Sequence, residues 1–208
     1  MENPDFTCTE RIQEAIEAGI ALRTAMNSNI DPPLLRLAAV QEQNKLFKRY
    51  KEKFSYSLTR QFNNLFIHYG NHKGEVFKNG DGLALPQHSA VHKDLHAYIE
   101  LMHWMKVMDR KVYEHLKNLY TESLGKLYDR DVKRLFEMAK DRIGVSGSVS
   151  SPTRNVALLG LDRDQWTLET TTIEKNTYES TLDQLLTQLE PVCLQEQQFC
   201  VTFFQVIA

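Results

Sequence analysis

Residues 86–140 read PQHSAVHKDLHAYIELMHWMKVMDRKVYEHLKNLYTESLGKLYDRDVKRLFEMAK, and this stretch decides the fold class. It contains one glycine, Gly125, and no proline after Pro86. Apolar residues recur in it at intervals of three or four, which is the period of an amphipathic helix. We expect two successive helices, the second of which begins at Asp109, because an aspartate at that position can accept a hydrogen bond from the first helical turn.

The rest of the chain also favours helices. Helical spacing of apolar residues predicts one helix over 9–26 and a long one that begins at Asp31–Pro32 and ends near Tyr69, with Gly70 in a left-handed conformation after it. The segment 144–174 begins with small polar residues and indicates a flexible linker. We therefore expect an all-α fold of long antiparallel helices with three parts: a helical bundle (1–143), a linker (144–174) and a truncated helix that begins the next bundle layer (175–208).

Composition narrows the functional class. The chain has 208 residues, of which 42% are hydrophobic and 25% charged, as is usual for a folded soluble protein. Its net charge is -2, so no broad basic field favours a nucleic-acid partner. The three cysteines are far from any zinc-binding spacing and are expected to be free thiols in a reducing compartment.

The histidines are the first candidates for chemistry. His88, His92 and His96 lie four residues apart and share one face of a helix, a spacing at which imidazoles can bind zinc. The HExxH pattern is missing, and Lys93 would repel a cation. Phosphate-binding loops and nucleophile elbows are missing from the sequence as well. We expect no catalytic residue, no metal and no cofactor, with a metal-dependent enzyme as the weakest alternative.

A basic cluster on the second predicted helix is the more informative polar feature. Interspersed with Phe47, Tyr50 and Phe54, its cations could bind anionic lipid or an acidic partner. They could equally extend their stems along the apolar stripe and keep their charges in water. The members of the basic cluster are Lys45, Lys48, Arg49, Lys51 and Lys53.

The predicted hydrophobic core combines aromatic and leucine side chains at helical spacing. Trp104 is its strongest anchor, because an indole buries a large apolar area. The predicted core residues are Phe54, Phe62, Phe66, Trp104, Leu116 and Leu127.

Three extended segments resemble a known family. They are residues 47–71, residues 95–140 and residues 182–200, the last of which reads LDQLLTQLEPVCLQEQQFC. In order and spacing they are similar to the animal members of the exocyst complex component 1 family. The resemblance implies a fragment of the helical rod region of such a protein.

What the resemblance implies is a scaffold without enzymatic activity. Members of the family form stacked helical bundles in a complex that tethers secretory vesicles to the plasma membrane before fusion. The expected partners are other exocyst subunits, and the expected location is the cytoplasm, peripheral to the plasma membrane at exocytic sites. Small GTPases and phosphoinositide membranes would bind through a domain that this sequence does not match. The alternative is a membrane-surface module that binds anionic lipid through the basic cluster.

Overall fold

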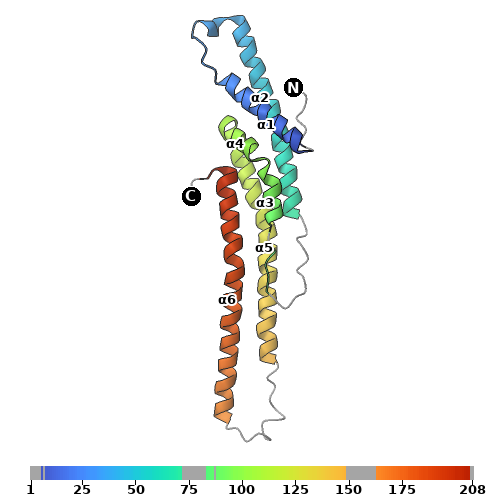
Figure 1. The fold of residues 1–208 in the computed structure, drawn as a ribbon, viewed down its shortest axis with the longest axis vertical. Coiled ribbons are helices and arrows are strands. Elements are labelled where there is room, and N and C mark those ends of the chain that lie inside the picture. The colour runs from blue at the N-terminus through green and yellow to red at the C-terminus, as the bar shows by residue number, and fades with distance from the viewer. Residues whose placement is uncertain (1–5, 7, 72–82, 87, 149–162, 207–208) are drawn as a thin grey trace. The chain divides into compact units, whose positions relative to one another are not determined.

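Figure 1 shows the computed structural model, which describes residues 6, 8–71, 83–86, 88–148 and 163–206, with the side chains of 144–148 and 163–175 outside the description. All regular structure in these ranges is helical. This confirms the predicted all-α helical bundle. The elements are α1 (Thr9–Met26), the 3-10 turn η1 (Leu34–Arg36), α2 (Ala38–Asn71), α3 (Ser89–His96), α4 (Ile99–Met108), α5 (Arg110–Ser148) and α6 (Arg163–Phe204).

Helix α1 has the predicted bounds, whereas α2 begins later than predicted. The N-cap of α1 is Cys8, and the helix ends where the Asn27 N–H donates to the Arg23 carbonyl. After Asp31, the chain forms the short turn η1 and then extends at Leu37, so α2 starts at Ala38. Pro32 disfavours helical conformation only at the preceding Asp31, and the extended backbone of Leu37 separates η1 from α2.

The end of α2 also differs from the prediction. Gly70 lies inside α2 rather than after it, and its φ is not in the left-handed range. Its lack of a side chain serves close packing instead. A Cβ atom on Gly70 would lie 2.6 Å from the carbonyl oxygen of Ser123 on α5.

The stretch 86–140 forms three helices where two were predicted. The extra break separates α3 from α4 at Ala97–Tyr98. Tyr98 is buried there, its ring lies edge-on to Phe62, and its hydroxyl accepts a 3.2 Å hydrogen bond from Gln61. Contacts with α2 therefore hold Tyr98 in place at this break.

Asp109 begins α5 as predicted. Its Oδ1 accepts a hydrogen bond from the backbone N–H of Val112 at 3.4 Å, and its Oδ2 accepts one from Ser55 at 2.8 Å. One carboxylate thus caps α5 and connects it to α2.

Helix α6 begins earlier than the predicted residue 175. It starts at Arg163 and continues through Pro191, while α5 extends to Ser148. Neither glycine nor proline occurs between Arg163 and Glu190, so the backbone meets no helix breaker there. The predicted linker contains Ser151–Pro152, a pair of the kind that proline-directed kinases phosphorylate, and this pair lies outside the described residues.

Contacts divide the chain into two compact units. Unit 1 comprises residues 1–72, 88–127 and 197–208, and unit 2 comprises residues 73–87 and 128–196. The predicted division into 1–143, 144–174 and 175–208 groups the residues differently and stays a prediction. None of the described helices has the length and hydropathy that crossing a membrane requires.

In unit 1, α1 packs on α2 and α4, and an aromatic core lies between α2, α4, α5 and the end of α6. The Phe203 ring is 6.2 Å from that of Phe62 and 6.4 Å from that of Tyr120. The Phe54 and Trp104 rings meet edge to face at 4.8 Å. These geometries are the favourable ones for aromatic pairs.

In unit 2, α5 and α6 run antiparallel and share a core with the segment before α3. Tyr128 pairs with Glu196 at 2.5 Å, and Arg142 pairs with Gln184 at 3.2 Å, which fixes the antiparallel register. Figure 1 shows the two helices side by side. The buried apolar core of unit 2 consists of Leu83, Leu85, Leu135, Ala139, Leu185 and Val192.

Candidate functional site

The basic cluster lies on α2 and faces solvent. Lys45, Lys48, Arg49 and Lys53 are exposed, and Lys51 is half-buried. Lys45 forms an ion pair with Glu42 at 2.8 Å, three residues earlier on the helix. Such an exposed pair contributes little to stability. The cluster therefore presents accessible positive charge, and a ligand for it stays a prediction.

The six predicted core residues are all buried in unit 1, with exposed fractions of 3% or less. Trp104 combines two interactions there. Its indole N–H donates a 2.8 Å hydrogen bond to the carbonyl oxygen of Gly19, and its ring packs on Phe54. A Cβ atom on Gly19 would lie 3.1 Å from Phe54 and 3.2 Å from Trp104. Because Gly19 has no side chain, α1 can approach Trp104 closely enough for this hydrogen bond.

The three histidines of the predicted stripe differ in environment. His88 precedes α3 and is buried, His92 is buried within α3, and His96 is exposed. The His92 ring stacks on Phe199 with centroids 4.3 Å apart. Within the described ranges, no group of three or more histidine, cysteine or acidic side chains is placed to hold a metal ion.

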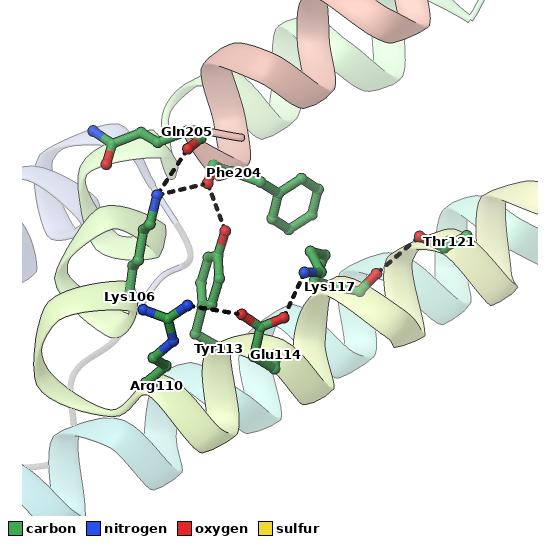
Figure 2. Close-up of polar contacts among 8 residues, drawn as sticks. All are labelled: Lys106, Arg110, Tyr113, Glu114, Lys117, Thr121, Phe204 and Gln205. Atoms are coloured by element: carbon green, nitrogen blue, oxygen red, sulfur yellow. Dashed lines mark hydrogen bonds and ion pairs between the residues drawn. The ribbon is translucent and has the colours of Figure 1, made fainter. Parts of the chain in front are cut away.

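The most connected polar site caps the C-terminal end of α6, and Figure 2 shows it. We call it the α6 capping site. Lys106 on α4 donates to the carbonyl oxygen of Gln205 at 2.8 Å, and Tyr113 on α5 donates to that of Phe204 at 2.5 Å. His103 lies 3.1 Å from the carbonyl oxygen of Thr202. These carbonyls end α6 and have no partner further along a helix, so the side chains of two other helices satisfy them.

Electrostatic interactions strengthen the α6 capping site. The negative end of the α6 dipole faces the Lys106 ammonium group, a favourable arrangement. Burial raises the pKa of the Tyr113 phenol, so the hydroxyl stays protonated and remains a donor. Beside it, Glu114 bridges Lys117 at 2.5 Å and Arg110 at 3.8 Å, and the hydrogen bond from Lys117 lowers the pKa of that carboxyl.

The α6 capping site was not predicted from the sequence. Lys106, Tyr113 and His103 had no predicted role in capping. Its only sequence signal is the apolar end of the chain, where Phe199, Phe203 and Phe204 recur at helical spacing. In the structure these three rings are buried in the core of unit 1.

Sequence comparison defines the relationship of the chain. It is 44% identical over 220 residues to exocyst complex component 1 of Drosophila melanogaster, a match that covers 99% of this chain. The chain is related to a fragment of exocyst complex component 1. It is also 26% identical to the Mus musculus protein of that name over 99% of this chain, and 25% identical to the Dictyostelium discoideum one over 64%.

The match covers only part of the length of each relative. The chain spans 25% of the length of the Drosophila protein and 28% of the mouse protein. No family model matches the chain, and no solved structure matches it. The relationship to exocyst component 1 thus rests on extended sequence similarity.

Proposed function

We propose that this chain forms a scaffold segment of an exocyst subunit, in a complex that tethers secretory vesicles to the plasma membrane before fusion. The observation that carries this proposal is the 44% identity to the Drosophila relative across 99% of the chain. The helical architecture supports it, because packed helices hold a fixed length and offer extended faces to partners.

The proposed role is assembly rather than catalysis. The connected polar site described above, at the end of α6, directs its donors at main-chain carbonyls, a structural use of those groups. The proposed partners are other exocyst subunits, at a cytoplasmic position peripheral to the plasma membrane. Small GTPases and phosphoinositides would contact parts of the subunit outside this sequence.

A segment exchange tests the proposal. In Drosophila cells depleted of exocyst component 1, the relative is reintroduced with its matching segment replaced by this chain. We expect the hybrid to co-purify with the other exocyst subunits and to restore secretion of a reporter. A Tyr56→Ala hybrid is the matched control, because that side chain is 71% exposed. A hybrid that accumulates normally but assembles with no exocyst subunit would contradict the proposal.

A second candidate function is binding to anionic membranes through the basic cluster. Four exposed cations on α2 favour it, since each basic residue near an anionic surface contributes about 1 kcal/mol. Flotation with phosphoinositide vesicles tests it, using Lys45→Glu, Lys48→Glu, Arg49→Glu and Lys51→Glu in one variant. Lys126→Glu combined with Lys133→Glu, on α5, is the control. Flotation that is absent, or equal in all three proteins, rules this function out.

A further inference from the structure

The outer face of α6 in unit 2 combines exposed leucines with carboxylates. Glu179, Leu182, Asp183, Leu186, Glu190 and Leu194 follow one another at intervals of three or four residues, except for the adjacent pair 182–183. Positions at such intervals share one side of a helix. All six side chains are exposed. We call these six residues the acidic leucine stripe.

The leucines of the stripe are exposed because α6 has a second apolar side. Leu185 and Val192 fill the core of unit 2. Leu182, Leu186 and Leu194 lie on another side and are 42%, 57% and 57% exposed. Single exposed leucines are ordinary, but three along one helix face form a surface typical of a docking site.

The charge of α6 selects the kind of partner. Between Asn176 and Val206 the sequence contains acidic residues and neither lysine, arginine nor histidine. Within the stripe, Asp183 and Glu190 stand one helical turn from Leu186, on either side of it in sequence. A partner that covers these leucines must bring positive charge beside its own apolar residues, since like charges across an interface cost free energy.

We propose that the acidic leucine stripe is the docking site for an amphipathic helix of another protein, whose apolar stripe is flanked by lysine or arginine. A helix fits because leucines at intervals of three and four residues accept the knobs of a second helix. An anionic membrane does not fit, because its surface repels the carboxylates. The basic cluster of a second copy could supply cations, but the neighbouring Phe54 is already buried in its own unit.

Two designed peptides of equal length test whether the stripe requires positive charge on its partner. Both carry leucines at intervals of three and four, flanked by lysine in one and by glutamate in the other. Fluorescence anisotropy measures their binding to the 208-residue chain. We expect the lysine peptide to bind and the glutamate peptide not to bind. Leu182→Ser combined with Leu186→Ser should weaken binding of the lysine peptide about tenfold or more.

Charge reversal makes the test specific. Asp183→Lys combined with Glu190→Lys should make the chain prefer the glutamate peptide, a result that also shows that the variant is folded. Leu34→Ser with Leu35→Ser, at exposed leucines of unit 1, is the control and should change nothing. Equal binding of both peptides, or a preference unchanged by charge reversal, would overturn the proposal.

Sedimentation analysis tests whether the stripe instead binds a second copy of this chain. If the chain dimerises and Leu186→Ser abolishes the dimer, the stripe binds a second copy, and the proposal of a foreign helix is wrong. This inference is independent of the exocyst proposal, because the peptide measurements concern the surface of α6 alone. Either can fail while the other holds.

Discussion

Gly70 and Gly125 both lie inside long helices, yet a methyl group would meet different surroundings at the two positions. At Gly70 it would lie 2.6 Å from a backbone oxygen of α5, and at Gly125 nothing lies within 4 Å. Gly70→Ala should lower the free energy of unfolding by about 1–3 kcal/mol, since packed backbone must move. Gly125→Ala should raise it by about 0.5–1 kcal/mol, through helix propensity. Urea denaturation measures both changes, and a Gly70→Ala protein as stable as the Gly125→Ala protein would refute the close approach.

Tyr69 should make the stability depend on pH in the alkaline range. Burial, together with Asp94, raises its pKa from 10.0 to about 12, and its hydroxyl donates to Asp94 at 3.1 Å. In the unfolded chain the phenol ionises near its ordinary pKa, so stability is fully present below about pH 10 and decreases up to about pH 12. Tyr69→Phe should flatten this part of the stability profile.

Denaturation between these pH values measures the effect. Tyr56→Phe is its control, because Tyr56 is exposed and should leave the profile unchanged. A Tyr69→Phe protein with the alkaline slope of the parent chain would show that another group is responsible.

Single residues differ in how far the sequence predicts their role. The N-terminal capping role of Asp109 follows from local chemistry, because the carboxylate acts within its own turn. Burial of Trp104 follows from its size. The contact of Gly70 with Ser123 does not follow, since it joins residues far apart in the chain and depends on how closely two helices approach.

At the scale of elements, the end of α6 depends on side chains of α4 and α5. Tyr113→Phe removes the donor to the Phe204 carbonyl and should cost about 0.5–1.5 kcal/mol of unfolding free energy. Amide exchange should rise in the last turn of α6, because its carbonyls lose a partner. Tyr178→Phe, at a ring that is 54% exposed, should leave exchange at that turn unchanged. An unchanged exchange rate in the Tyr113→Phe protein would contradict the capping role.

Helix existence was predictable, whereas several boundaries were not. Periodic apolar residues identified α1 with its bounds, Thr9–Met26. The break at Ala97–Tyr98 contains neither glycine nor proline. It is stabilised by contacts of Tyr98 with α2, which no local pattern encodes.

At the scale of the whole molecule, two separate cores should respond separately to substitution. Leu116 in unit 1 and Leu135 in unit 2 are both fully buried, on the same helix. Replacing either by alanine should cost about 2–5 kcal/mol. Hydrogen exchange should show the largest loss of protection in the unit that contains the substitution. Identical exchange maps for Leu116→Ala and Leu135→Ala would contradict a division into two units.

Which side chains lie on the surface of the molecule was the feature least predictable from the sequence. The spacing of the α6 leucines does not show which side of the helix is covered, because periodicity identifies apolar residues and not their neighbours. Leu185 is buried and Leu186 is exposed, although they are adjacent and identical. The packing of α5 and of the segment before α3 distinguishes them, and the acidic leucine stripe therefore became visible in the structure alone.

The hydrogen bond between Trp104 and Gly19 has a practical consequence. A buried indole in an apolar core emits at shorter wavelength than one in water, so this ring is an intrinsic optical reporter of whether α1 is docked. The chain has one other tryptophan, Trp166. In a Trp166→Phe background, the emission spectrum would follow the attachment of α1 in real time without an added dye.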